Sequence, residues 1–281
     1  MINKSKLQPG VEIGELESRL LDRDYLLFIK LPWNYDHEDA EYPVLFCVDG
    51  NRSFPFYSTM SLVYETPGTS REDIVVVGIG YKVDEDRISG LADWAAWRTY
   101  DLTPERDEGV ENFWTKKLSS LTNDDDREVE TGGAPIFLHS IHEEIIPFIE
   151  SNYRISASRR GLAGYSFGGL FTLYALFHEP KMFSNYLAGS PTMWDQLFDY
   201  EQDYAIRRDD LETSVFLTAA SLEHELVARL ERMVELLRSP KYPGLKIDYK
   251  IFEGEGHASA YPSFVSNALL SFYGESRTDV K

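Results

Sequence analysis

The 281-residue sequence predicts an α/β fold with a mainly parallel central sheet flanked by helices. Short runs rich in Val, Ile and Phe alternate with segments whose apolar residues recur at helical spacing, which is the pattern of βαβ units. The length exceeds the commonest domain size, yet α/β folds of this length often form one domain. We therefore expect residues 1–281 to form a single domain.

Seven apolar runs are predicted to be strands, and three segments are predicted to be helices. The strands cover residues 25–31, 44–48, 74–80, 161–164, 186–188, 215–218 and 247–252. Apolar side chains recur near every 3.6 residues in segments 136–149 and 226–237, as in amphipathic helices. A third helix is expected over 170–177, ending near Pro180.

Residues 81–133 break this alternation and are predicted to be an inserted, lid-like segment. The segment contains Trp94, Trp97 and Trp114, followed by an acidic run at 124–126 that reads as a solvated loop. We expect the insertion to lie over the carboxyl edge of the sheet, where open α/β sheets bind their ligands.

Composition and charge exclude several classes of function. The net charge of −19 opposes binding to nucleic acid or to an anionic membrane, because such binding draws on clustered Lys and Arg. No run approaches the roughly 18 apolar residues of a membrane span, and the first ten residues lack the apolar middle of a secretory signal. The single cysteine, Cys47, lies in an apolar run and is expected to be a buried structural thiol. A cytoplasmic location is predicted, and oligomeric state is not indicated.

The segment from Gly164 to Gly168 matches the nucleophile elbow, G-x-S-x-G, with Ser166 at its centre. An apolar strand precedes it and a helix follows, which is the context that the elbow requires. Small residues are needed at both glycine positions because the serine sits on a sharp, strained turn. The alternative is a tight strand-to-helix turn without catalysis.

A serine hydroxyl needs a positioned base, which in this fold follows the nucleophile and the acid along the chain. Of six histidines, only His257 lies in a loop after a late strand, and it is the predicted general base. The acid should follow the strand over 215–218, and Glu223 is the first choice, with Glu225 as the alternative. Either glutamate could instead stabilise the first turn of its helix.

The oxyanion hole is predicted to use the backbone N–H of Phe167 and one from the loop after Val48, at Gly50 or Asn51. Asp49-Gly50 could equally be a simple turn. No H-E-x-x-H pattern, Cys cluster or histidine pair at ligand spacing supports a metal, and no cofactor is expected.

Several segments together resemble the esterases related to enterochelin esterase and esterase D, and within them the branch that contains ferri-bacillibactin esterase. These segments are residues 48–50, 98–104, 137–153, 164–171, 189–194 and 255–257, so the resemblance covers most of the chain from about Tyr25 onward. It implies an α/β-hydrolase fold that cleaves carboxylic esters with Ser166 as nucleophile, His257 as base and Glu223 as acid. Relatives often have two adjacent tryptophans where this chain has Trp194-Asp195, which weakens the case for a siderophore substrate.

The sequence thus predicts a serine carboxylic-ester hydrolase that acts on a small molecule through an acyl-enzyme. Trp94, Trp97 and Trp194 are expected to line the substrate pocket, with Arg52 and Arg98 as its basic residues. A siderophore trilactone esterase, an acyl transferase or a thioesterase would use the same machinery. The alternative from another class is a non-catalytic binding protein that keeps the fold.

Overall fold

The computed structural model describes residues 2–4, 10–21, 23–65, 72–207, 212–239 and 242–273, and within these ranges nine strands form one sheet. The strands are β1 (Ile2–Lys4), β2 (Val11–Glu17), β3 (Asp24–Lys30), β4 (Tyr42–Cys47), β5 (Val75–Tyr81), β6 (Ile155–Tyr165), β7 (Asn185–Gly189), β8 (Ser214–Ala220) and β9 (Lys246–Phe252). The helices are α1 (Gly50–Tyr64), α2 (Arg87–Asp101), α3 (Glu108–Thr122), α4 (Ala134–Ser140), the π-helical turn η1 (Ile141–Ile145), α5 (Ile146–Asn152), α6 (Phe167–His178), α7 (Gln196–Arg207), α8 (His224–Leu237) and α9 (Ala260–Tyr273).

The strand order is β1-β2-β3-β5-β4-β6-β7-β8-β9. All pairings from β5 to β9 are parallel, whereas β1, β2 and β3 pair antiparallel with their neighbours. The chain passes from β4 to β5 on one side and then crosses to β6 on the other side of β4. The carboxyl ends of β4 and β6 therefore flank the topological switch point, where ligands bind in open α/β sheets.

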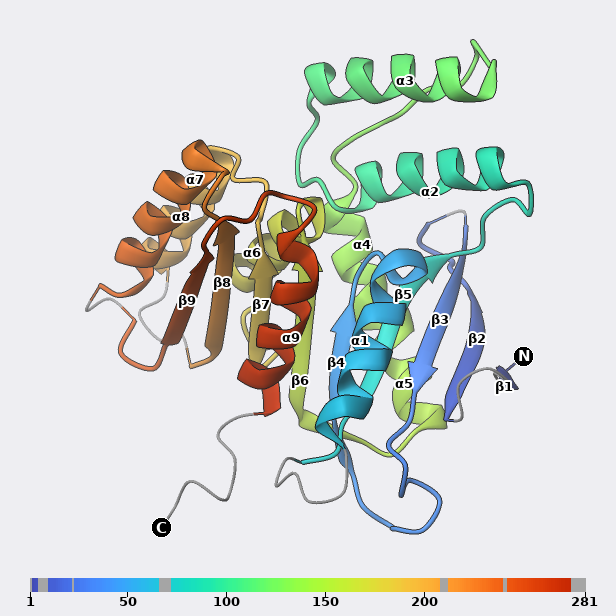
Figure 1. The fold of residues 1–281 in the computed structure, drawn as a ribbon, viewed down its shortest axis with the longest axis vertical. Coiled ribbons are helices and arrows are strands. Elements are labelled where there is room, and N and C mark those ends of the chain that lie inside the picture. The colour runs from blue at the N-terminus through green and yellow to red at the C-terminus, as the bar shows by residue number, and fades with distance from the viewer. Residues whose placement is uncertain are drawn as a thin grey trace.

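Helices cover both faces of the sheet (Figure 1). α1 and α9 pack on one face, in a core cluster with Leu45 and Cys47 of β4. α4, α5, α6 and α8 pack on the other face, in a cluster with Val44 and Phe46 of the same strand. Successive side chains of β4 thus enter opposite cores, which explains its uninterrupted apolar sequence.

Two helices, α2 and α3, form the segment between β5 and α4 and lie beyond the carboxyl ends of the strands (Figure 1). Asp86 caps α2 by accepting the N–H groups of Ile88 and Ser89, and Asp107 caps α3 by accepting that of Val110. A separate small core that includes Ala92, Ala95, Leu118 and Val129 holds the two helices together. Both helices lie within residues 81–133, the segment predicted to be an insertion.

The seven strands predicted from the sequence correspond to β3–β9, and the predicted helices to α4–α5, α6 and α8. β1 and β2 are not among the predicted strands. Cys47 is fully buried as expected, and burial raises the pKa of its thiol to about 12. The acidic run at 124–126 is exposed. Within the described ranges, no helix combines the length and the apolar character that crossing a membrane would require.

Candidate active site

Ser166 occupies a strained turn between β6 and α6. Its φ of 61° and ψ of −118° lie outside the regions that L-residues favour. A Cβ added at Gly164 would lie 2.1 Å from the carbonyl oxygen of Gly168, and one added at Gly168 would lie 2.9 Å from Val48. Neither glycine position of the elbow therefore has room for a side chain. The Ser166 side chain makes no capping hydrogen bond to α6, so its hydroxyl is not used by the helix.

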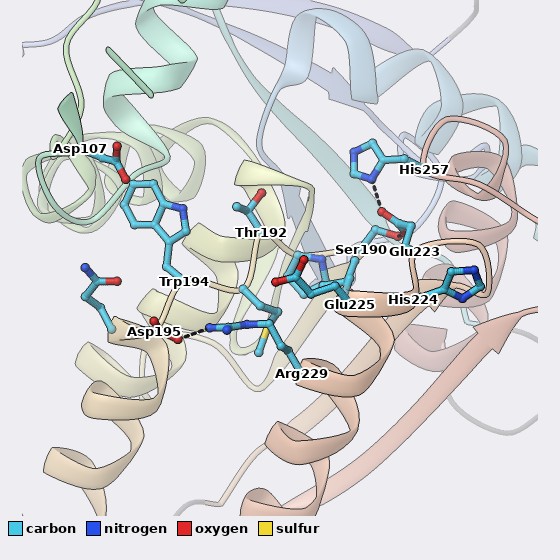
Figure 2. A pocket seen from close by; sticks show the side chains of 14 residues that line it. Asp107, Ser190, Thr192, Trp194, Asp195, Glu223, His224, Glu225, Arg229 and His257 are labelled. Carbon is cyan, nitrogen blue, oxygen red and sulfur yellow. Dashed lines mark hydrogen bonds and ion pairs between the residues drawn. The ribbon is translucent and has the colours of Figure 1, made fainter. Parts of the chain in front are cut away.

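His257 and Glu223 form a hydrogen-bonded pair beside this serine. His257 Nδ1 lies 2.6 Å from Glu223 Oε1 (Figure 2). His257 lies in the loop between β9 and α9, and Glu223 is the residue immediately before α8. His257 and Ser166 line the same cavity, although no hydrogen bond joins Ser166 Oγ to the imidazole among the described residues. Such bonds are often long before substrate binds.

The Glu223 carboxylate is held by further donors. Its Oε2 accepts the Ser190 hydroxyl at 2.7 Å and the Ala220 N–H at 3.1 Å. Glu223 is the N-cap residue of α8 but makes no side-chain cap bond, so the carboxylate serves the imidazole and not the helix. Glu225 lies in the first turn of α8 and lines a neighbouring cavity. Of the two candidate acids, Glu223 is the one that contacts His257.

The cavity that contains Ser166, called the Ser166 cavity below, has a volume of about 320 Å³. Its lining residues include Asp49, Arg52, Trp94, Arg98, Tyr165 and Tyr261. The Arg52 guanidinium lies 3.9 Å from the centre of a Trp94 ring, and burial lowers the pKa of this arginine from its ordinary value. Among the described residues, no carboxylate forms an ion pair with Arg52.

Arg98 differs from Arg52 because its charge is already paired. Its Nε and Nη2 donate to the two Asp49 oxygens at 2.7 and 2.8 Å. Burial works against the charge of Arg98, but the adjacent carboxylate raises the pKa of its guanidinium above the ordinary value. Arg52 is therefore the cation that remains available to a substrate in this cavity.

A second and larger cavity, of about 730 Å³, is also lined by His257 and is called the Trp194 cavity below. His257 and Glu223 line it together with Trp194, Asp195, Glu225 and Arg229, as Figure 2 shows. Asp195 pairs with Arg229. The space around His257 and Glu223 is thus divided into a smaller basic cavity and a larger cavity with several carboxylates.

Four of the residues predicted for the site, Gly50, Asn51, Phe167 and Trp97, line neither the Ser166 cavity nor the Trp194 cavity. The Gly50 backbone is pressed against β5, where an added Cβ would lie 2.6 Å from Ile79. The Asn51 side chain bonds both backbone polar groups of Tyr81, at 2.7 and 2.8 Å. Trp97 packs against Tyr81 and Arg23. Trp97 therefore does not form the pocket wall expected of it.

Sequence reasoning assigned no role to Asp49, Tyr165 or Ser190. Tyr165 belongs to the elbow and Ser190 to segment 189–194, one of the segments that resemble the esterases, and this was the available signal. Their hydroxyls contact His257 and Glu223 from elements that only the fold brings together. Within the described ranges, no cluster of three or more His, Cys, Asp or Glu side chains is arranged to hold a metal ion.

Comparison with known proteins adds independent information. The family model described as "Putative esterase" matches residues 110–225. The chain is 31% identical over 276 residues to ferri-bacillibactin esterase BesA of Bacillus subtilis, covering 93% of this chain and 89% of the relative. It is 34% identical over 152 residues to the siderophore enterobactin esterase of Emericella nidulans, covering 53% of this chain and 46% of that protein.

Solved structures agree with this assignment. The BES protein from Bacillus cereus superposes with a TM-score of 0.75 at 29% identity, covering 96% of this chain and 97% of that chain. Siderophore hydrolase EstB from Aspergillus nidulans has the same fold, with a TM-score of 0.75 at 22% identity over 95% of each chain. The chain therefore belongs to this esterase family, a family of carboxylic ester hydrolases with the α/β-hydrolase fold.

Proposed function

We propose that Ser166, His257 and Glu223 form the catalytic triad of a serine carboxylic-ester hydrolase. The observation that carries the proposal is the His257–Glu223 hydrogen bond of 2.6 Å at the mouth of the cavity that contains the elbow serine. An imidazole fixed through Nδ1 presents its Nε2 as a base. This arrangement is what an activated serine requires.

In the proposed mechanism, Ser166 Oγ attacks the ester carbonyl while His257 takes the serine proton. The imidazolium then protonates the departing alkoxide, which leaves an acyl-enzyme. Water, deprotonated by His257, attacks the acyl-enzyme, and the proton returns to Ser166 as the acid is released. Glu223 keeps the imidazole in one tautomer and stabilises its charged form.

The tetrahedral oxyanion needs hydrogen-bond donors that are already in place. We assign this role to the Phe167 N–H at the start of α6 and to an N–H from the start of α1, at Gly50 or Asn51. First-turn N–H groups have no intrahelical acceptor, and the positive end of each helix dipole favours the negative charge. The hydrogen bonds of Asn51 to Tyr81 use its side chain and not its backbone N–H.

The substrate proposed is a small carboxylic ester that is uncharged or mildly anionic. The Ser166 cavity is lined mainly by apolar atoms and offers one unpaired cation, Arg52, within the described part of the chain. The overall charge of −19 opposes a ligand with several negative charges. A cytoplasmic location stays a prediction from the sequence.

A siderophore ester is the second candidate substrate. The names of the relatives favour it, and so does the stacked Arg52–Trp94 pair, which could receive an electron-rich aromatic ring. The discriminating experiment measures kcat/KM for neutral p-nitrophenyl esters of graded acyl length and for a ferric tricatecholate trilactone. Each substrate is assayed at low and high salt.

We expect the neutral esters to be the better substrates, with rates that salt does not change. Efficient hydrolysis of the ferric trilactone that weakens steeply with salt would select the siderophore ester instead. In that case local basicity, and not net charge, would control recognition. Ser166→Ala serves as the blank for both substrate classes.

A further inference from the structure

Two hydroxyl groups, those of Ser190 and Tyr165, form hydrogen bonds to Glu223 and His257 next to the elbow. The Ser190 hydroxyl donates to Glu223 Oε2 at 2.7 Å. The Tyr165 hydroxyl lies 2.6 Å from the carbonyl oxygen of His257, to which it donates, and 3.0 Å from Ser190 Oγ. From the structure we infer that Ser190 and Tyr165 are positioning residues of the reaction, which fix Glu223 and His257 relative to Ser166. This inference rests on the proposed triad.

The chain places these hydroxyls at the ends of two adjacent parallel strands. Tyr165 is the last residue of β6, immediately before Ser166, and Ser190 follows β7 directly. Tyr165 is paired with Gly189 in the parallel ladder, so Tyr165 and Ser190 both lie at the carboxyl end of the sheet. The nucleophile and both positioning groups therefore share one rigid support.

The backbone conformation of Ser190 indicates that its hydroxyl makes a stabilising contact. Its φ of 35° lies in the left-handed region that favours glycine, and only 1% of the residue is exposed. A buried non-glycine residue in this conformation costs stability, so the side chain needs a compensating contact. Its bond to the Glu223 carboxylate is that contact.

Tyr165 is suited to act as a permanent donor. Burial raises the pKa of its phenol to about 12, so the hydroxyl keeps its proton across the working pH range. The ring also packs against the His257 imidazole, with 5.2 Å between the ring centres. Tyr165 thus restrains His257 at two points, the backbone carbonyl and the imidazole ring. Half of the His257 side chain is exposed.

Ser190 binds one Glu223 oxygen and leaves the other to His257. The Ala220 N–H binds the same oxygen as Ser190, so the carboxylate cannot rotate its second oxygen away from the imidazole. Loss of the serine donor should therefore reduce catalysis through Glu223 and leave substrate binding intact.

The test is a double-mutant cycle between Ser190→Gly and Glu223→Gln, assayed with a neutral p-nitrophenyl ester. Glycine suits the left-handed backbone, so Ser190→Gly should melt within about 3 °C of the wild type. Its kcat should fall by about 10-fold with KM unchanged, the scale of one hydrogen bond to a charged group. In the Glu223→Gln background the same change should alter kcat by less than about 2-fold, because Ser190 acts through Glu223.

Tyr165→Phe keeps the ring and removes only the donor. We expect kcat to fall by about 3-fold to 10-fold, again with KM unchanged. Ser184→Gly is the matched control, because Ser184 flanks the other end of β7 and its hydroxyl donates to the Arg160 carbonyl, away from the site. Its kcat should equal that of the wild type.

A wild-type kcat in Ser190→Gly would overturn the inference, as would an equal loss in both Glu223 backgrounds. A loss shared with Ser184→Gly would also overturn it, since that result would indicate a general effect on the sheet. These outcomes differ from failure of the proposed triad, in which Ser166→Ala would keep the wild-type activity.

Discussion

Arg98 and Asp49 form a buried bidentate ion pair that connects the inserted segment to the carboxyl end of β4. Arg98 belongs to α2, and Asp49 follows β4 with a φ of 60°. The two N–O distances are 2.7 and 2.8 Å, and both side chains are at most 13% exposed. Because both residues line the Ser166 cavity, this pair fixes the wall of the cavity that α2 contributes.

We predict that Arg98→Met lowers the free energy of unfolding by about 3–5 kcal/mol, because it leaves the Asp49 carboxylate buried and unpaired. Urea unfolding followed by circular dichroism measures the change. Arg106→Met is the control, since Arg106 is 74% exposed and its pair with Glu111 should contribute at most about 1 kcal/mol. Equal midpoints for wild type and Arg98→Met would refute the prediction.

Arg52 should determine preference for negatively charged acyl groups. In Arg52→Gln, kcat/KM for an aromatic ester with a carboxylate on its acyl group should fall by about 10-fold. The value for the uncharged analogue should change by less than about 2-fold. Arg238→Gln is the matched control, because Arg238 also lies over an aromatic ring, that of Tyr249, but does not line either cavity. An equal loss for both esters would exclude a role in charge selection.

Asp101 should make stability depend on pH. Burial raises the pKa of this fully buried carboxyl to about 7 from its ordinary value of 3.8, against the opposing effect of Arg23. Between these values the folded state holds the proton and the unfolded state does not, so rising pH favours unfolding. The stability of wild type relative to Asp101→Asn should therefore fall between about pH 4 and pH 7, by at most about 1.4 kcal/mol per pH unit.

Comparison of Asp101→Asn with wild type cancels the other titrating groups, including Glu65, whose pKa burial also raises to about 7. Urea titrations at several pH values provide the measurement. Parallel stability curves for the two proteins would show that Asp101 does not titrate in this range.

Glu223 and Glu225 should differ sharply in their effect on catalysis. Glu223→Gln removes the carboxylate bonded to His257, and kcat should fall by a factor on the order of 10² to 10⁴. Glu225→Gln should have nearly wild-type kcat because it does not contact the imidazole. A thermal melt of each variant controls for misfolding. Wild-type activity in Glu223→Gln would mean that Ser166 and His257 suffice, and a larger loss in Glu225→Gln would assign the acid to Glu225.

Sequence pattern predicted the parallel part of the sheet well because most of its strands are buried on both faces. β4, with all six residues buried, is an example. β2 was missed because its sequence, VEIGELE, is rich in glutamate and its apolar side chains, at Val11, Ile13 and Leu16, do not keep a strict alternation. Its strand structure comes from pairing with β3 along all seven residues, which a local pattern does not reveal.

Local sequence was enough to predict the turn that carries Ser166 and the loop that carries His257, two residues that line the same cavity. The site was less predictable where a side chain can face several directions. Trp94 and Trp97 lie three residues apart on α2, yet Trp94 faces the Ser166 cavity and Trp97 packs against Tyr81. The bond from Ser190 to Glu223 spans 33 residues and depends on the order of β7 and β8 in the sheet.

The most direct test of the catalytic account is labelling of the intact protein with a fluorophosphonate, followed by mass spectrometry of its peptides. An activated serine with an oxyanion hole reacts with this probe, whereas an ordinary surface serine does not. We predict one modified residue, Ser166, together with loss of both labelling and ester turnover in Ser166→Ala. An unlabelled wild-type protein, or ester turnover that persists in Ser166→Ala, would contradict the account.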